Sequence, residues 1–497
     1  MVLPTLRINT CPTRPLLPRG AAITLVASSL LLFSTAFGSS STTSADSAAS
    51  SPAITDKAVT RAVERSIFVD SLVAHDGLDV RTENGIVTLQ GGVPTLYGKE
   101  RAVEHAQSIK GVRAVIDRIE VRAARRPDEE LRLDVLEALR VDPATNSMKI
   151  AVTPHNGEIV LGGTVQSWAE RELAAEVVKT VRDVQGVNNK LQIQLSGGRG
   201  DDELEADIRE RLRTDVWLTG RIFDVAVSDG VVVLRGTVGS ALEKNRALSR
   251  AHVLGVKTVD GTDVVVEWWA RNYMRQADYV FPTDSEITRA VKDALRHDPR
   301  VWTANPDIEV VAGAVTLRGV VGSLSAKQAA ESDASGTLGV RTVNNYLKVR
   351  PAETKDDDSL ARAVQARLAA SALVDRYDIG VVAHQGTIVL TGSVDSDTEK
   401  QAAGELASRI QGVMGLRNRI AVEGDGSQLK SDRDIQEEIQ DELWWSPFVD
   451  QEQVHVDVRD GVATLTGRVH SWWEKNRATK NAFEGGARVV RNKLEVQ

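Results

Sequence analysis

The stretch "NGIVTLQGGV" (Asn84–Val93) is repeated near the end of the chain as "DGVATLTGRV" (Asp460–Val469). Aligning the chain with itself gives six copies of one pattern. A turn glycine is followed after four residues by Leu, after six by Gly, after eight by Val and after seventeen by Ala. The turn glycines are Gly85, Gly157, Gly230, Gly313, Gly386 and Gly461, and the strand glycines are Gly91, Gly163, Gly236, Gly319, Gly392 and Gly467. Five positions held in all six copies identify an internal repeat, called a module below.

The turn glycine follows Asn or Asp in four copies, and Ala or Gln in the other two. Asn-Gly and Asp-Gly are typical of tight hairpins, because both central residues of the turn need positive φ. The residues after the turn alternate: Val87, Leu89, Gly91 and Val93 share one face of an extended strand. The quoted stretch therefore predicts a β-hairpin in every module.

Helix-period segments flank the hairpin. In the fourth copy, Ile287, Val291 and Leu295 share one helix face, and Thr283 or Asp284 can cap its start. A second helix rich in Glu, Lys, Arg and Ala follows the hairpin, and each copy closes on an alternating segment. The predicted fold class is α+β, with six tandem repeats of a small helix–strand–strand–helix–strand module.

The copies set the predicted boundaries. They are a signal peptide 1–38, a small-residue linker 39–54, modules 55–121, 128–195, 201–268, 283–350, 356–423 and 432–497, and an inter-triplet linker 269–282. Only modules 3 and 6 carry "EKNRA", so we interpret the array as two triplets, one duplicated from the other. The last strand of module 3 breaks the pattern and is the least regular.

The strand glycine and the helix alanine are both small. One interpretation is that they face each other in every module, so that the second helix packs closely on the hairpin. The alternative is that each residue is small for its own local reason. The sequence does not separate the two.

The pattern G-x-V-x-L-x-G-x-V, followed by an Ala-bearing helix and G-V-x-x-V-x-N-x-L-x-V, resembles the BON domain family. The resemblance covers nearly the whole chain after its first segment. It implies a small α/β module of bacterial envelopes, associated with osmotic or envelope stress, with binding of phospholipid surfaces and in some members with chaperone-like activity. The family pattern implies no enzymatic residues.

The start of the chain predicts export. Arg7, Arg14 and Arg19 precede an apolar run, Ala21–Gly38, and a tract of small polar residues follows. This order is typical of a secretory signal peptide, which would make the mature protein periplasmic. The alternative is an uncleaved N-terminal anchor. The single cysteine, Cys11, precedes the apolar run, so cleavage would leave no thiol.

Composition excludes some functions. The net charge of −8 argues against general nucleic-acid binding, which needs clustered Lys and Arg. The eight histidines occupy different repeat positions without ligand-like spacing, which predicts no metal site. Nucleophile and phosphate-binding motifs are absent from the sequence. We therefore expect no enzyme and no cofactor.

Tryptophan provides the candidate binding residues. Three adjacent pairs occur, and Trp472–Trp473 precede Lys475, Arg477 and Lys480. The segment from His470 onward contains six cationic and three acidic residues, which gives it a local charge of +3 in an acidic chain. Indole rings beside cations suit a membrane interface, so we predict that these five residues bind lipid. The alternative is that the tryptophans join one module to the next.

Two functions remain. The first is a non-enzymatic envelope protein whose linked modules together bind phospholipid surfaces, in protection against osmotic or envelope stress. The second is a chaperone-like or scaffolding protein that binds other envelope proteins. The sequence gives neither the ligand, nor the oligomeric state, nor the arrangement of the modules.

Overall fold

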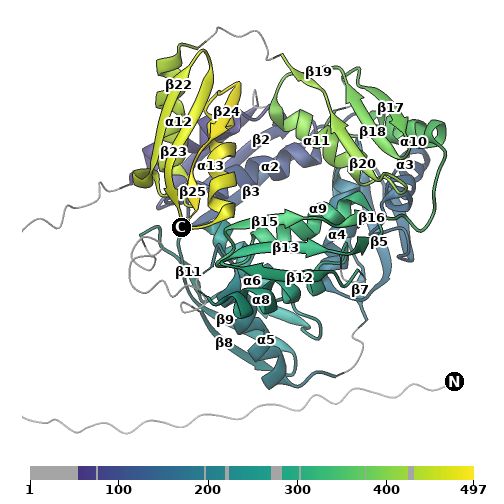
Figure 1. Ribbon diagram of the computed structural model, residues 1–497, viewed down its shortest axis with the longest axis horizontal. Coiled ribbons are helices and arrows are strands. Elements are labelled where there is room, and N and C mark those ends of the chain that lie inside the picture. Colours follow the sequence, from purple (N-terminus) through teal and green to yellow (C-terminus); the bar gives the residue numbers. More distant parts are fainter. Residues whose placement is uncertain are drawn as a thin grey trace, which may run out of the picture. The chain divides into compact units, whose positions relative to one another are not determined.

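The computed structural model describes residues 54–73, 77–194, 198–218, 223–269, 282–301, 304–374, 377–423 and 430–496 (Figure 1). The predicted signal peptide, almost all of the linker after it and most of the predicted inter-triplet linker lie outside these residues. The α+β fold class is confirmed: every module has two helices and a small sheet.

Module 1 shows the plan. Its elements are α1 (Asp56–Phe68), β1 (Leu78–Glu83), β2 (Ile86–Val93), α2 (Leu96–Gln107) and β3 (Ala114–Val121). The strand order is β1-β2-β3, with β1 antiparallel and β3 parallel to β2. Buried and exposed residues alternate along the strands, so one sheet face packs on the two helices and the other is open.

Modules 2 and 3 repeat the plan. Module 2 contains α3 (Asp128–Val141), β4 (Ile150–His155), β5 (Glu158–Val165), α4 (Trp168–Lys179), β6 (Gly186–Asn189) and β7 (Gln192–Ile193). Module 3 contains α5 (Asp201–Thr214), β8 (Phe223–Ser228), β9 (Val231–Val238), α6 (Ala241–Ala251), β10 (Thr258–Asp260) and β11 (Val264–Val266). The irregular end of module 3 still forms strands, because β10 and β11 both pair parallel with β9.

The remaining modules are built alike. Module 4 contains α8 (Asp284–His297), β12 (Asp307–Val311), β13 (Ala314–Arg318), β14 (Val320–Val321), α9 (Leu324–Ser335), β15 (Thr342–Asn345) and β16 (Lys348–Val349). Module 5 contains α10 (Asp357–Ala369), β17 (Gly380–His384), β18 (Thr387–Thr391), β19 (Ser393–Val394), α11 (Asp397–Ser408), β20 (Gly415–Asn418) and β21 (Ala421–Val422). Module 6 contains α12 (Asp432–Trp445), η2 (Gln451–Gln453), β22 (Val454–Arg459), β23 (Val462–Val469), α13 (Trp472–Glu484), β24 (Val489–Asn492) and β25 (Glu495–Val496).

The hairpin turns have the predicted backbone. Both central residues have positive φ in all six modules, for example Asn84 at 53° and Gly85 at 73°. An aspartate at the first position of the first helix holds each turn, which the sequence analysis missed. In module 6, Asp432 accepts hydrogen bonds from the backbone N–H groups of Asp460 and Gly461, both at 2.8 Å. The helix start and the turn are therefore fixed to each other.

The strand glycine does not face the helix alanine, so the close-approach interpretation is wrong. Gly392 has φ 124°, and a Cβ built there would lie 2.6 Å from the carbonyl oxygen of Asp378, at the start of the neighbouring strand. A side chain at this position, between β18 and β19, would therefore meet the backbone just before the neighbouring strand. Ala403 is small for a different reason, since it is fully buried in the core of the module.

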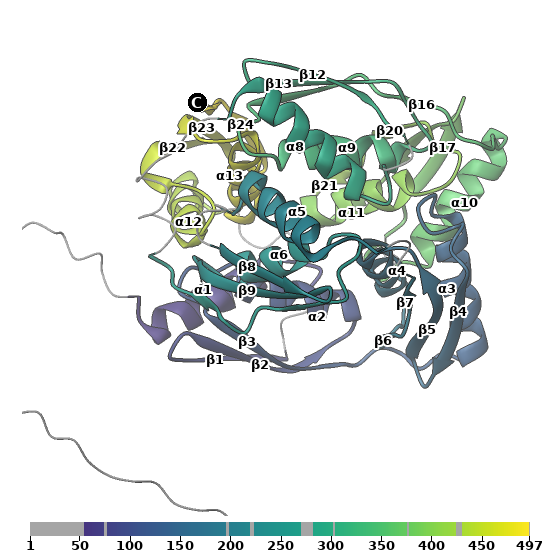
Figure 2. The same cartoon turned by 90° about the horizontal axis from the view of Figure 1, so that it is seen from below.

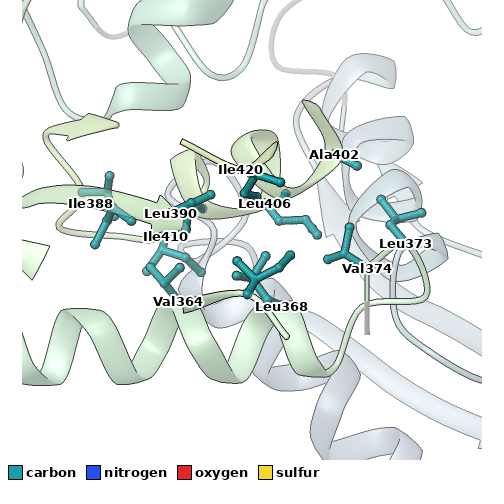
Figure 3. Close-up of a cluster of buried hydrophobic side chains, with 14 of the residues drawn as sticks. Val364, Leu368, Leu373, Val374, Ile388, Leu390, Ala402, Leu406, Ile410 and Ile420 are labelled. Atoms are coloured by element: carbon teal, nitrogen blue, oxygen red, sulfur yellow. The ribbon is translucent and has the colours of Figure 1, made fainter. Parts of the chain in front are cut away.

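Each module has its own hydrophobic core between helices and sheet. Figure 3 shows that of module 5, where Val364 and Leu368 of α10 meet Ile388 and Leu390 of β18. The core continues into other modules, because Val141 of module 2 belongs to the same cluster. The modules are therefore packed against one another within the unit that begins at Ile54.

Modules pair in a nested order: 1 with 6, 2 with 5, and 3 with 4. The same hydrogen bond joins each pair, from a backbone N–H just after the second helix of one module to a carbonyl at the end of the first helix of the other. The bonds are Lys110 N to Trp445 O (3.0 Å), Arg182 N to Ala370 O (2.9 Å), Gln411 N to Val141 O (2.8 Å) and Leu338 N to Thr214 O (2.8 Å). Exchanging the two triplets maps this set onto itself, as an approximate two-fold relation requires.

We predict that Gly392→Val destabilises the protein by roughly 2–4 kcal/mol, because valine meets both positive φ and the Asp378 carbonyl. Thermal or urea unfolding measures the loss. Ser393→Val, at the neighbouring half-buried position, is the matched control and should change stability by less than about 1 kcal/mol. Equal effects of the two variants would contradict the close approach of Gly392 to the Asp378 carbonyl.

Candidate functional site

The second helix of module 6, α13, carries all five predicted lipid-binding residues. Ser471 caps the helix by accepting a hydrogen bond from the Glu474 N–H at 3.0 Å. The ring of Trp473 packs against Trp217 of module 3 and Phe448 of module 6, with centroids 4.5 Å and 5.2 Å away. The module-contact alternative therefore describes the environment of Trp473.

Trp217 and Phe448 hold equivalent places, thirteen residues before Gly230 and Gly461. Their rings also contact each other, with centroids 4.8 Å apart. Each ring is covered by the arginine sixteen residues after its module's turn glycine. The guanidinium carbon of Arg246 lies 4.3 Å from the centroid of the Trp217 ring, and that of Arg477 lies 5.7 Å from the centroid of the Phe448 ring. This repeated arrangement places Arg477 inside a contact between the triplets.

The remaining predicted residues are also engaged within the protein. Trp472 is half-buried, and its backbone N–H donates to Val340 O of module 4 at 3.4 Å. Lys475 Nζ lies 5.5 Å from the Trp472 ring and donates to Leu494 O at 2.7 Å. Burial lowers the pKa of Lys480, whose Nζ lies 3.8 Å from Glu484. Contact of these five residues with lipid stays a prediction.

The other two tryptophan pairs differ in their surroundings. Trp444 and Trp445 meet edge to face at 4.5 Å, and Lys110 of module 1 lies 4.9 Å from the Trp444 ring. Trp445 also packs against the core of module 1. Trp269 is different, with half of its surface exposed at the end of module 3. Aromatic side chains thus serve module contacts at most of these positions.

Sequence reasoning missed a buried polar residue at the end of every first helix. It stands fifteen residues before each turn glycine: Asp70, Asp142, Asp215, Asp298, Ser371 and Ser446. Each side-chain oxygen accepts a hydrogen bond from the N–H two residues later. The fixed spacing was visible in the repeat and could have revealed these residues.

Buried arginines neutralise several of these aspartates. Asp70 accepts from Arg101 and from His105, at 2.6 Å and 2.7 Å. These partners overcome the effect of burial and hold the pKa of Asp70 well below its usual range. Asp215 binds Arg246 and Arg250 in the same way. Charged pairs therefore lie between helices in the interior of the array.

The pKa values of two other buried acids are raised instead of lowered. Burial, assisted by the nearby Asp298, raises the pKa of Asp333 to about 8. Burial and the charge of Glu484 raise the pKa of Glu442 to about 7, although Arg65 of module 1 lies 3.6 Å away. Glu442 thus titrates near neutral pH where modules 1 and 6 meet.

One cluster has the composition of a metal site. Asp207 of α5 and Asp293 and His297 of α8, helices that lie side by side (Figure 2), hold their donor atoms within 4.8 Å of one another. Arg199 already donates to Asp207 at 2.9 Å, and Arg211 carries a positive charge close to His297. These arginines supply the positive charge that a metal ion would bring to the acidic side chains, so we interpret the cluster as an ion-pair contact between modules 3 and 4.

The described helices include none that is both long and apolar enough to span a membrane. The absence of enzymatic activity and of cofactors stays a prediction.

A known protein family matches each of the six modules. The model of the BON domain family matches residues 55–123, 127–194, 200–266, 283–351, 356–424 and 431–497. Osmotically-inducible protein Y of Escherichia coli is 28% identical over 144 residues, covering 28% of this chain and 72% of that protein. Outer membrane lipoprotein DolP of Haemophilus influenzae is 29% identical over 136 residues, covering 26% and 69%.

A solved structure of CdsD, a structural protein of the type III secretion system of Chlamydia trachomatis, covers 45% of this chain and 98% of its own. It is 15% identical with a TM-score of 0.13.

We predict that Trp473→Ala destabilises the array by roughly 2–4 kcal/mol, because it empties the space between Trp217 and Phe448. Chemical denaturation followed by circular dichroism measures the change. Trp269→Ala, at a half-exposed ring, is the control and should be nearly neutral. An equally neutral Trp473→Ala would mean that the ring does not hold the triplets together.

We also predict that Glu442→Gln changes the pH dependence of stability. Because the folded state raises the pKa from 4.5 to about 7, the Glu442 contribution is fully present below pH 4.5 and is lost as pH rises to about 7. Relative to wild type, the variant should therefore gain stability between pH 5 and 7.5. Glu437→Gln, on an exposed face of α12, should show no such relative gain in unfolding midpoint.

Proposed function

The chain belongs to the BON domain family, and we propose that it is a non-enzymatic binding protein of the bacterial envelope that engages anionic phospholipid surfaces. One relative is by name an outer membrane lipoprotein, which supports an envelope location, and the other is by name osmotically inducible, which supports a role in osmotic stress. The proposed task is protection of the envelope under osmotic stress. The signal peptide prediction is consistent with this location.

The observation that carries the proposal is the open sheet face of module 6. Arg491 and Lys493 are exposed there, and Val489, on the same strand as Arg491, is 50% exposed. β24 pairs with β23 so that Arg491 lies beside Thr464, away from the helices. Cations around an exposed apolar side chain fit anionic headgroups and the boundary beneath them.

This assignment moves the binding surface from α13 to the sheet. Trp473 and Arg477 are used in contacts with module 3 and Phe448, so they are less available than the sequence suggested. Trp472 and Lys475, at the start of α13, remain the members of the predicted group that we propose as a second lipid contact. Weak binding sites on linked modules reinforce one another, so six modules in one chain can bind a surface more tightly than any one of them.

We predict that the full chain floats with vesicles of phosphatidylglycerol and phosphatidylcholine, and that flotation falls as salt rises. Arg491→Gln with Lys493→Gln should weaken binding roughly 30-fold at low salt, at about 1 kcal/mol for each cation. The matched control is Arg433→Gln with Arg362→Gln, which removes the same charge from exposed helix faces. A wild-type chain that fails to float, or a control that weakens binding equally, would contradict the proposal.

A second candidate is a chaperone-like or scaffolding role towards other envelope proteins. It is favoured by exposed apolar side chains on the open sheets of modules 4 and 5, namely Val311, Tyr346 and Val382, each more than 60% exposed. Suppression of aggregation of an unfolded client without vesicle binding would favour this role. Changing Val382 to Ser should then reduce suppression.

A further inference from the structure

Asn-Gly occurs twice in the chain, as Asn84–Gly85 in the hairpin turn of module 1 and as Asn156–Gly157 in that of module 2. Asparagine before glycine is prone to lose its side-chain amide, because glycine has no side chain to keep the next backbone nitrogen away from that amide. The two pairs have the same residues in the same place of the repeat. The surrounding fold, however, holds the two glycine nitrogens differently.

In five of the six modules, two hydrogen bonds close the turn. In module 1, Asp56 accepts from the Asn84 N–H at 2.8 Å and from the Gly85 N–H at 2.9 Å. Modules 3, 4, 5 and 6 contain the same two bonds, with the glycine N–H 2.8 to 3.0 Å from the aspartate. A carboxylate on the glycine N–H holds that nitrogen in place and opposes the loss of its proton beside a negative charge.

Module 2 lacks the second of these bonds. Asp128 accepts from the Asn156 N–H at 3.3 Å, and the Gly157 N–H makes no hydrogen bond with any residue that the structure describes. The Gly157 nitrogen is therefore not held by a carboxylate, unlike its five counterparts.

A histidine lies beside the same side chain. Asn156 Nδ2 is 3.3 Å from Nε2 of the exposed His155, whereas module 1 has Glu83 at this position. An imidazole can accept and return a proton near neutral pH, so it is placed to assist the departure of this nitrogen.

Water has space at this turn. A pocket of about 270 Å³ adjoins it, and Asp128, Asn156, Gly157 and Gln185 are among the residues that line the pocket. A pocket of this size with polar walls can hold water molecules. The reactant that deamidation needs besides the chain itself can therefore reach both Asn156 and Gly157.

We propose that Asn156 is a site of spontaneous deamidation in the folded protein, and that Asp56 protects Asn84 from the same reaction. The Gly157 nitrogen gives its proton to water and attacks the side-chain carbonyl carbon of Asn156. The bond from that carbon to Nδ2 breaks, and Nδ2 leaves as ammonia with a proton from His155, which water then restores. A second water molecule opens the resulting succinimide ring to aspartate or isoaspartate.

Both products change module 2. Each adds a carboxylate to a pocket wall that already contains Asp128 and Asp183, and like charges repel. Isoaspartate also lengthens the backbone between β4 and β5, next to the pairing of His155 with Glu158. The modified chain should therefore unfold at a lower temperature than the newly made one.

The test incubates the wild-type full chain at mildly alkaline pH, folded and in urea, and follows both sites by peptide mapping with mass spectrometry. We expect Asn156 to react roughly tenfold faster than Asn84 in the folded chain, because Asn84 reacts only after a hydrogen bond to a carboxylate breaks. The two rates should be comparable in urea, where neither turn is held. Equal rates in the folded chain, or a difference that persists in urea, would overturn the proposal.

Two variants separate the contributions. Asp56→Ala should raise the rate at Asn84 towards that at Asn156, and an unchanged rate in the folded variant would refute the protection. His155→Gln should slow the reaction at Asn156, whereas His384→Gln, at the same place in module 5, should not. An equal rate at Asn156 in these two histidine variants would exclude His155 from the reaction.

Discussion

The arrangement of the array depends on one backbone hydrogen bond, made between modules and repeated in each pair. The last carbonyls of a helix have no partner inside the helix. Here the carbonyls of Trp445, Thr214, Val141 and Ala370 accept N–H groups from just after the second helix of another module. Each first helix in these contacts is therefore completed by another module, which fixes the pairs 1–6, 2–5 and 3–4.

The consequences reach the side chains. Because the helix ends meet, the polar residue that follows each first helix becomes buried, and arginines such as Arg101, Arg246 and Arg409 neutralise three of them. The same packing encloses Trp217, Phe448 and Trp473 where modules 3 and 6 meet. With helix faces involved in module contacts, the open sheet faces are the surfaces best placed for a ligand, which is why we assign lipid binding there.

The repeat predicted the module well, because its signals are local. Turn residues such as Asn84 and Gly85 fix the hairpin, and periodicity fixes the helices. Contacts across the array left no local signal: Trp473 next to Lys475 and Arg477 looks the same in sequence whether its ring meets lipid or Trp217. The strand glycine was misassigned because its partner, the Asp378 carbonyl, belongs to the backbone and has no sequence pattern.

The pairing of modules 2 and 5 is tested most directly by a disulfide across it. Val181 and Ser371 lie opposite each other in an isolated antiparallel bridge, a geometry that suits a disulfide. With Cys11 replaced by Ser, Val181→Cys with Ser371→Cys should oxidise within the monomer and raise its unfolding temperature. Failure of this pair to cross-link, while Val181→Cys with Thr337→Cys of module 4 cross-links readily, would contradict the nested pairing.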